Sequence, residues 1–414
     1  MTMARPARSR LNAGEPTVFT WPLDPVLLLA AVFLLFSGIV MVASASVETS
    51  ARLHNAEFFM FLKHCVYVVL ALGAGGLALS VPIAVWQRLA YPLLALSFLL
   101  LIAVLVPGIG KTVNGSTRWI SLGAFSLQGS EFVKLFVVVF AAAWLVQFRE
   151  EVTTGFVGFL KPLAIVSGLV LLLLGQPDFG ASVVIMGTVL GMMFLAGVSL
   201  VHFVPTILAC LIMASSLIVL QPERFDRFIA FTDPWAHQFE GGYQLTQALI
   251  AFGRAEWFGL GLGNSIQKLF FLPEAHTDFL FSIIAEELGV LGALAIIAGF
   301  VCLVLRGAWI GRMAENRGEY FHAWLAYGIA LLLGIQASIN ICVNIGLLPT
   351  KGLTLPLMSY GGNSLIISCM LIAVLLRVEW ECRRGEYDGA AGRRSSVRRV
   401  EQRRGEKRRG GRRA

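Results

Sequence analysis

The chain has 414 residues, of which 57% are hydrophobic and only 14% are charged, and its formal net charge is +8. A soluble globular domain is closer to half apolar and a quarter charged, so this composition excludes an ordinary soluble protein. The apolar residues gather in runs of about 20, the length that a helix needs to cross roughly 30 Å of hydrocarbon. The sequence therefore predicts an all-α polytopic membrane protein with about ten transmembrane helices.

The predicted spans follow one another along the chain with mostly short connections. We expect them at residues 23–43, 62–81, 89–106, 131–148, 161–175, 179–197, 201–220, 278–305, 322–348 and 354–377. Most Lys and Arg residues fall on the inner side if both termini are cytoplasmic, which is the orientation that the positive-inside rule favours.

This orientation divides the chain into three parts. Residues 1–22 form a cytoplasmic N-terminal tail, and residues 23–377 form a ten-helix membrane domain. Residues 378–414 are rich in Arg and Gly, so we expect a disordered basic cytoplasmic tail that cannot bury a core. Attraction to anionic lipid headgroups explains such a tail better than nucleic-acid binding does.

Two connections on the outer face are long, covering residues 107–130 and 221–277. Within the second, the sequence YQLTQALIAF at residues 243–252 places apolar residues on one helical face. It predicts a short amphipathic helix at the membrane surface. The glycine run at residues 259–264 lacks the Lys–Ser/Thr of a nucleotide loop, so it predicts a turn where the backbone approaches a headgroup or a helix.

The most informative stretch is LPEAHTDFLFSIIAEELG at residues 272–289, where the large outer loop re-enters the membrane. It places Glu274, His276 and Asp278 at the rim, and Glu286 and Glu287 roughly 12 Å deeper at 1.5 Å per residue. Charges inside a bilayer are costly and usually functional. Adjacent positions face different ways, so we expect one of the two deep acids to line a cavity and the other to pair with a helix. The pattern favours an enzyme acting on a lipid-linked substrate.

The six cysteines show no CxxC spacing, and the six histidines show no metal-ligand spacing. We therefore predict no disulfide framework and no protein metal site.

Six motifs occur in order along the chain and carry a family likeness. They are NGSTRWI (114–120), SEFVKL (130–135), QPDFGAS (176–182), YQLTQALIAFG (243–253), LGNSIQKLFFLPEAHTDFLFSIIAEELG (262–289) and LLPTKGLTLPLMSYGGNSL (347–365). Together they closely resemble the SEDS family (shape, elongation, division and sporulation) of peptidoglycan glycosyltransferases. The last two motifs are more similar to its cell-division branch than to its elongation branch. The resemblance covers about residues 20 to 380.

The resemblance implies an enzyme that polymerises lipid II, a disaccharide-pentapeptide on undecaprenyl pyrophosphate, during septal cell-wall synthesis in bacterial cell division. It implies a location in the bacterial cytoplasmic (inner) membrane, enriched at the septum. The implied partners are a class B penicillin-binding protein and other divisome membrane proteins. Mg²⁺ or Mn²⁺ is expected to screen the pyrophosphate, although the sequence shows no protein cage for it.

Two other functions remain open for such a chain, a lipid II flippase and a non-catalytic divisome scaffold. A transporter often shows inverted repeats and helices broken at the midplane. The sequence has no evident repeat, and its motifs cluster on the outer face, which favours transfer chemistry.

Asp278 is the catalytic residue that the resemblance implies, because it matches the essential Asp of the family's HTD element. Its expected role is to take the proton from the 4-hydroxyl of the acceptor sugar. Burial and the nearby Glu274 or Glu286 would raise its pKa toward the range of a useful base. Glu274 and His276 are expected at the substrate. The alternative is that Asp278 only caps a helix beginning at Phe279.

Four further residues are candidate substrate ligands. Glu131 and Lys134 are three apart and share one helical face. Either they neutralise each other within the membrane, or Lys134 also binds phosphate. Arg118 and Lys351 lie in matching family motifs and are expected to contact the pyrophosphate, to which Arg binds in a bidentate manner.

Other polar residues are expected to be structural. Lys268 is expected to extend toward lipid headgroups as a surface charge. Asp178 is expected to cap the sixth span at its N-terminus, and the alternative is that it is a cavity acid. Asn340 and Asn344 are expected to form hydrogen bonds between helices.

Overall fold

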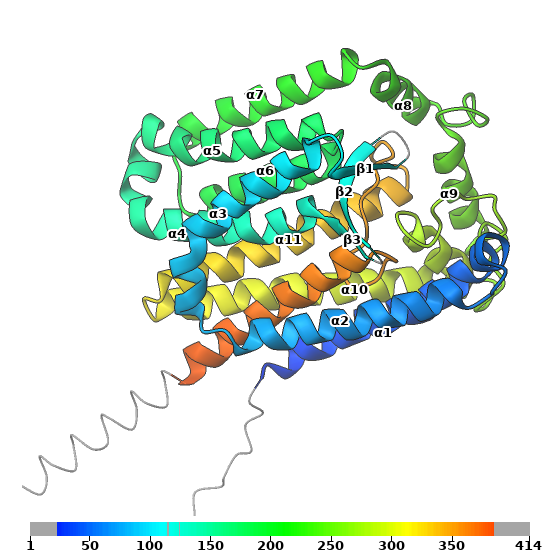
Figure 1. The fold of residues 1–414 in the computed structure, drawn as a ribbon, viewed down its shortest axis with the longest axis horizontal. Coiled ribbons are helices and arrows are strands. Elements are labelled where there is room, and N and C mark those ends of the chain that lie inside the picture. Colours follow the sequence, from blue (N-terminus) through cyan, green and yellow to red (C-terminus); the bar gives the residue numbers. More distant parts are fainter. Residues whose placement is uncertain (1–22, 114–115, 124, 385–414) are drawn as a thin grey trace, which may run out of the picture.

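The structure is a computed structural model that describes residues 23–113, 116–123 and 125–384. Within that part of the chain, eight helices are long and apolar enough to cross a membrane, and Phe179–Leu195 is a shorter apolar helix. The helices run roughly alongside one another in a bundle (Figure 1). The predicted helical membrane fold is confirmed, while the number of helices that cross the membrane stays a prediction.

Every predicted span overlaps a helix of the structure. The first seven helices are α1 (Pro25–His54), α2 (Phe59–Ser80), α3 (Ile83–Leu105), α4 (Gly129–Thr154), α5 (Phe156–Gly175), α6 (Phe179–Leu195) and α7 (Leu200–Val219). They are followed by α8 (Pro222–Thr232), α9 (Tyr243–Arg254), α10 (Leu280–Asn316), α11 (Tyr320–Asn344) and a final helix over residues 362–384. The final helix begins later than predicted, because residues 351–361, which include Pro356 and Gly361, do not adopt helical geometry.

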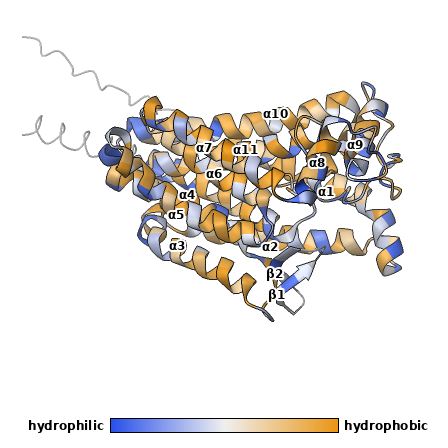
Figure 2. Cartoon of the chain, turned by 90° about the horizontal axis from the view of Figure 1, so that it is seen from above, coloured by the Kyte–Doolittle hydropathy of each residue, from blue (hydrophilic) through white to orange (hydrophobic). Residues whose placement is uncertain are grey.

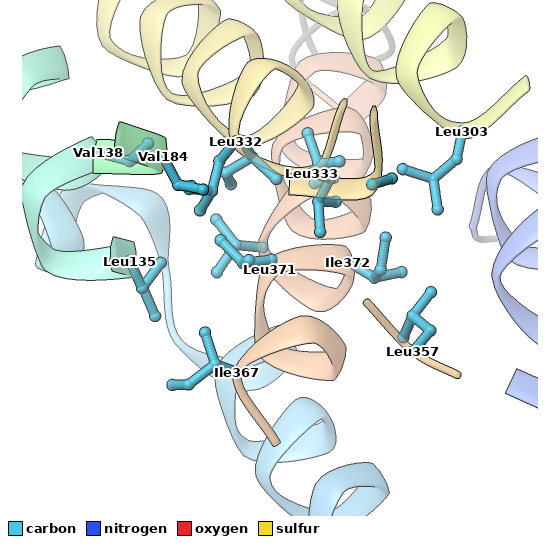
Figure 3. Packing of buried hydrophobic residues seen from close by; sticks show 14 of the residues in the cluster. Leu135, Val138, Val184, Leu303, Leu332, Leu333, Leu357, Ile367, Leu371 and Ile372 are labelled. Atoms are coloured by element: carbon cyan, nitrogen blue, oxygen red, sulfur yellow. The ribbon is translucent and has the colours of Figure 1, made fainter. Parts of the chain in front are cut away.

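The centre of the bundle is built around α4 and α11. In the most apolar window of α4, 72% of the residues are buried, whereas none is buried in that of α7. Leu135 and Val138 of α4 lie near Val184 of α6 and Leu332 of α11 in the core (Figure 3). Apolar residues also cover the outside of the bundle (Figure 2). In a membrane these outer residues face lipid, so their exposure is favourable.

A three-stranded antiparallel sheet, absent from the sequence prediction, occupies the first long loop. Its strands are β1 (Gly110–Val113), β2 (Ser116–Leu122) and β3 (Phe125–Gln128), in the order β1-β2-β3. Trp119 in the central strand pairs with Lys111 on one side and Gln128 on the other. The sheet lies toward the end of the bundle that also carries α8 and α9, opposite the start of α1 (Figure 1). We call this end the sheet end.

The second long loop is tied into a break in α10. Gly289 has φ +73°, which interrupts the helix, and the N–H of Leu260 donates to the freed carbonyl of Glu286 over 2.9 Å. A Cβ at Gly259 would lie 2.3 Å from the carbonyl oxygen of Glu287, so only glycine fits this approach. The predicted glycine turn is confirmed, and what it approaches is a helix.

The amphipathic helix predicted in the same loop is also present, as α9. Leu245 and Ala248 on its apolar face are buried. The Phe252 ring lies 5.8 Å, centroid to centroid, from that of Phe281 in α10. Protein therefore covers much of the face that was expected to meet the membrane surface.

Candidate active site

A polar cavity of about 440 Å³ lies at the sheet end, beside the sheet. Its walls come from α2, β2, β3, the start of α4, the α5–α6 turn, residues 274–278 and residues 352–364. The motifs distant in sequence thus converge on one chamber. The charged side chains that line it are Lys63, Arg118, Glu131, Asp178, Glu274 and Asp278.

Asp278 lies two residues before the start of α10 and is partly buried in the cavity wall. Its backbone carbonyl accepts hydrogen bonds from the side-chain amides of Asn340, over 2.9 Å, and Asn344, over 3.0 Å. Its carboxylate lies beside Gly352, where an added Cβ would come within 3.1 Å of Oδ2. Two α11 amides therefore fix the backbone, and a glycine leaves the carboxylate accessible.

The surroundings of Asp278 raise its pKa to about 7. Burial is the largest cause of this increase, and the negative charges of Glu274 and Asp178 raise the pKa further. The positive charge of Arg118 lowers the pKa and offsets part of the increase. A general base is most useful when its pKa lies near the working pH. Asp278 can therefore accept a proton at neutral pH, which an ordinary aspartate does poorly.

The alternative role of Asp278 as a helix cap is wrong. Helix α10 begins at Leu280, and the residue in its N-cap position is Phe279 rather than Asp278. The side chain of Phe279 forms no hydrogen bond to the first turn of the helix. Instead, Oδ1 of Asn344 accepts from the N–H of Ser282 over 3.1 Å and from its hydroxyl over 2.7 Å. The expected interhelical role of Asn344 is confirmed, and the residue both caps α10 and holds Asp278.

Glu131 and Lys134 form the expected buried pair. Nζ of Lys134 lies 2.8 Å from Oε1 of Glu131 and also donates to Oε1 of Gln336 over 2.8 Å. Glu131 lines the cavity, whereas Lys134 is 2% exposed and lies behind it. The geometry therefore favours the structural reading of Lys134, which orients Glu131 and joins α4 to α11.

Arg118 faces the cavity from β2, whereas Lys351 does not reach its lining. Arg118 donates to the backbone carbonyls of Gln176, over 3.3 Å, and Pro177, so its guanidinium is held in place. Nζ of Lys351 lies 4.5 Å from the centre of the Phe179 ring. Burial, followed by two neighbouring arginines, lowers the pKa of Lys351 to about 8.

Glu274 lines the cavity, but His276 lies behind its wall. The carboxylate of Glu274 accepts from the hydroxyl of Thr277 over 2.7 Å. The His276 ring is 5.4 Å from the Tyr360 ring, and the His276 carbonyl accepts from the N–H of Tyr360 over 2.9 Å. His276 therefore supports a wall residue of the cavity, and burial lowers its pKa.

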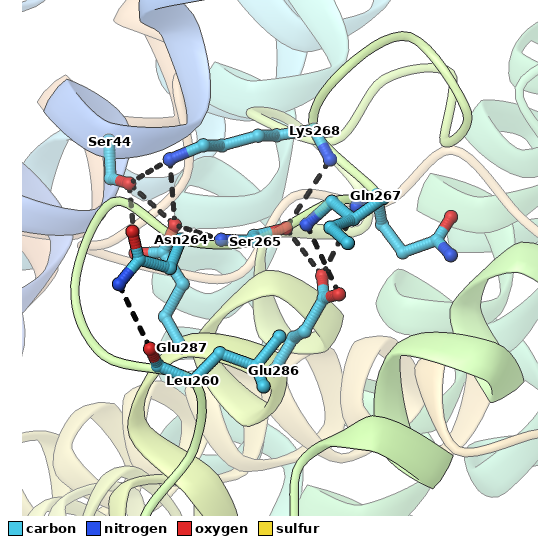
Figure 4. A network of polar contacts seen from close by, with 9 residues as sticks. Ser44, Leu260, Asn264, Ser265, Gln267, Lys268, Glu286 and Glu287 are labelled. Carbon is cyan, nitrogen blue, oxygen red and sulfur yellow. Dashed lines mark hydrogen bonds and ion pairs between the residues drawn. The ribbon is translucent and has the colours of Figure 1, made fainter.

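The prediction that Glu286 or Glu287 lines the cavity is wrong for both residues. Each is fully buried. Glu286 accepts from the Ser265 hydroxyl and from the N–H groups of residues 266 and 267, at 3.2 and 3.3 Å (Figure 4). Glu287 lies 2.9 Å from Nζ of Lys268 and also accepts from the Ser44 hydroxyl (Figure 4).

Lys268 was expected at the membrane surface, and this is also wrong. It is 8% exposed and bonds to both Glu287 and Ser44. An ion pair between a loop and a helix depends on tertiary packing, so sequence spacing did not reveal it. Together the three residues join α1, the large loop and α10.

Asp178 fills both roles considered for it, because it caps α6, accepting from the N–H of Ala181 over 3.1 Å, and also lines the cavity. Three other cavity residues were not predicted as site residues. Lys63, Tyr67 and Tyr360 line it as well. A lone cation near the start of an apolar helix was the signal that could have identified Lys63.

The carboxylates of the cavity do not form a metal site. Across the described ranges, no group of three or more His, Cys, Asp or Glu side chains could hold a metal ion. Octahedral Mg²⁺ binding by the protein alone would need such convergence. The residues present therefore do not fit a protein-held cation.

Comparison with known proteins matches the same part of the chain to one family. The family model for FtsW, RodA and SpoVE, described as "Cell cycle protein", matches residues 25–384. A "Probable peptidoglycan glycosyltransferase FtsW" of Pseudomonas fluorescens is 52% identical over 361 residues, covering 87% of this chain and 89% of that protein. The protein of the same name in Coxiella burnetii is 50% identical, covering 89% and 99%.

Solved structures show the same fold. A chain from a study of "polymerization and crosslinking by a peptidoglycan synthase complex" aligns with a TM-score of 0.72 and 26% identity, covering 87% of this chain and 98% of that chain. The rod shape determining protein RodA of Thermus thermophilus aligns with a TM-score of 0.64 and 25% identity, covering 86% and 96%. The chain therefore belongs to the SEDS family of FtsW, RodA and SpoVE, and it is most like the FtsW members.

Proposed function

We propose that this chain is a peptidoglycan glycosyltransferase that polymerises lipid II into glycan strands during septal cell-wall synthesis. The observation that carries the proposal is the placement of Asp278, with its pKa raised to about 7, in a polar cavity where a lipid-linked sugar can meet water. Relatives at about half identity bear the name of this activity.

Asp278 acts as the general base of the transfer. Its carboxylate takes the proton from the 4-hydroxyl of the acceptor sugar, and the hydroxyl oxygen uses its electron pair to form a bond to C1 of the donor sugar. The bond between C1 and the pyrophosphate oxygen breaks, and its electrons leave with the lipid pyrophosphate. One base suffices because pyrophosphate is a good leaving group.

Arg118 stabilises the departing pyrophosphate. Its guanidinium lines the cavity and is oriented by the carbonyls of residues 176 and 177. A donor that is already oriented contributes most where negative charge develops in the transition state. Mg²⁺ or Mn²⁺, if used, would be bound by the substrate's phosphates, since the described residues form no cage.

The active complex contains a class B penicillin-binding protein, and other divisome membrane proteins join it at the septum. Similarity to a chain of a peptidoglycan synthase complex supports the first partner. In this proposal the sheet end faces away from the cytoplasm, and both termini lie in the cytoplasm, as the distribution of Lys and Arg favours.

The test uses the purified protein with its cognate penicillin-binding protein, labelled lipid II, Mn²⁺ and penicillin. Penicillin blocks crosslinking, so a gel reports glycosyl transfer alone. Wild type is expected to yield long strands, and a folded Asp278→Asn variant is expected to yield none.

Strands from both proteins would contradict the base role of Asp278. No strands from either, with the complex intact, would contradict polymerisation. That result would direct attention to lipid II flipping or to a scaffold role, which a vesicle flipping assay and a partner pull-down distinguish.

A further inference from the structure

Lys63 occupies a different wall of the cavity from Arg118. It lies on α2, one helical turn before Tyr67, so the two side chains share a face. Both line the cavity, and Nζ of Lys63 lies 6.0 Å from the centre of the Tyr67 ring. A Cβ at Gly362 would come within 2.6 Å of that ring, so the glycine lets α2 pack against the start of the final helix and form this wall.

The two cations of the cavity differ in how they are held. The guanidinium of Arg118 is fixed by two backbone carbonyls of the α5–α6 turn. Lys63 is exposed and, among the described residues, has no carboxylate partner within 4.0 Å. Arg118 is therefore preorganised, whereas the ammonium group of Lys63 is free to adjust to an anion.

We propose that Lys63 binds the pyrophosphate of the acceptor lipid II, forming a second anion site beside the one at Arg118. This inference rests on the proposed polymerase function. The reaction brings together two lipid-linked pyrophosphates, and four carboxylates line the same cavity, so an unpaired cation on each wall offsets repulsion of both substrates.

The division between the two cations follows from the chemistry. The donor pyrophosphate gains charge as its bond to C1 breaks, so the rigid Arg118 suits it. The acceptor pyrophosphate remains bonded and its charge does not change during the step. A cation that binds the acceptor pyrophosphate therefore lowers the free energies of the ground state and the transition state equally. A flexible lysine can supply such a contribution.

The same ammonium group could instead bind an anionic lipid headgroup at the membrane surface. The shared chemistry is a phosphate, and the two sources are separated by lipid composition. A headgroup ligand with net negative charge would be present in vesicles containing phosphatidylglycerol and absent from vesicles of phosphatidylcholine alone, in which choline balances the charge of the phosphate. A substrate ligand would act equally in both.

The experiment compares Lys63→Met, Lys63→Arg and wild type in the intact complex with the penicillin-binding protein, in both kinds of vesicle. Lys111→Met is the matched control, because Lys111 is an exposed lysine of β1 outside the cavity lining. Loss of one charge-assisted contact should raise the KM for lipid II about tenfold in Lys63→Met while kcat changes little. Lys63→Arg should restore the KM, and Lys111→Met should match wild type.

A second readout does not depend on turnover. Lipid II binding is titrated in the inactive Asp278→Asn background, with and without Lys63→Met, and weaker binding in the double variant is expected. Unchanged binding and KM would overturn the role of Lys63. A defect only in anionic vesicles would assign Lys63 to headgroups and overturn it too. Failure of wild type to polymerise, with Lys63-dependent binding intact, would instead contradict the proposed function.

Discussion

Two glutamates and one aspartate lie within ten residues of one another along the chain and have opposite surroundings. Glu286 and Glu287 are fully buried, and their oxygens accept hydrogen bonds from the large loop, with Lys268 and Ser44 completing the pairing at Glu287. Asp278, less than three turns away along the chain, faces a polar cavity, and its carboxylate borders a glycine. The two glutamates stabilise the structure, and Asp278 is available for chemistry.

The comparison shows that depth in the membrane is a poor guide to the role of an acid. Burial of a charge is tolerated when hydrogen bonds and an opposite charge satisfy it, and such a group is then inert. An incompletely satisfied acid whose pKa is raised toward neutrality can accept a proton. Whether the carboxylate oxygens are fully hydrogen-bonded therefore distinguishes the structural acids, Glu286 and Glu287, from Asp278 better than their position in the membrane does.

The largest expected effect comes from breaking the buried pair. Lys268→Met leaves Glu287 charged and unpaired in the interior, which should lower the free energy of unfolding by about 3–5 kcal/mol. Thermal unfolding in detergent, followed by tryptophan fluorescence, measures the loss. Adding Glu287→Gln removes the orphaned charge, so the double variant should recover part of the stability. A single variant as stable as wild type would show that the pair contributes nothing.

A smaller effect is expected from the amide that holds the catalytic segment. Asn344→Ala removes the cap of α10, worth about 1 kcal/mol, together with one hydrogen bond to the Asp278 carbonyl. Strand synthesis should fall about tenfold, as expected when a catalytic group is misplaced. Gel assays normalised to folded protein check this. An unchanged rate would mean that Asn340 alone positions Asp278.

The smallest effect is a shift in the pH profile. The carboxylate must be ionised to accept a proton, and its pKa is about 7, so the rate should rise with pH through neutrality and then level off. Glu274→Gln removes a negative neighbour and lowers the pKa of Asp278, which moves the rising limb to lower pH. Arg118→Gln should move it to higher pH. Shifts in the reverse directions would exclude Asp278 as the titrating base.

Hydropathy located the apolar part of each helix predicted to span the membrane but not the full extent of the helix. Helix α10 was expected at residues 278–305 and extends to Asn316, because backbone hydrogen bonding continues past the hydrocarbon into polar residues. The break at Gly289 was missed, since its cause is a loop that returns to the helix from earlier in the chain. The sheet was missed too, although the β-branched and aromatic residues Thr117, Trp119 and Ile120 are typical of a strand.

The site was predicted where a motif carried the information and missed where only packing did. The motifs identified Asp278, Arg118, Glu131 and Glu274, and the cavity brings them together. They did not distinguish the lining from the residues directly behind it, such as Lys134 and His276. That distinction depends on side-chain direction and on contacts between distant segments, which sequence spacing does not encode.

The most direct test measures glycan synthesis and thermal stability together for Asp278→Asn and Glu286→Gln, each with the penicillin-binding protein. We expect Asp278→Asn to keep wild-type stability but to lose strand synthesis, with a rate loss of about 10²–10⁴. We expect Glu286→Gln to unfold at lower temperature yet to make strands in proportion to its folded fraction. A stable Glu286→Gln variant without activity, or an active Asp278→Asn variant, would contradict the division between structural and catalytic acids.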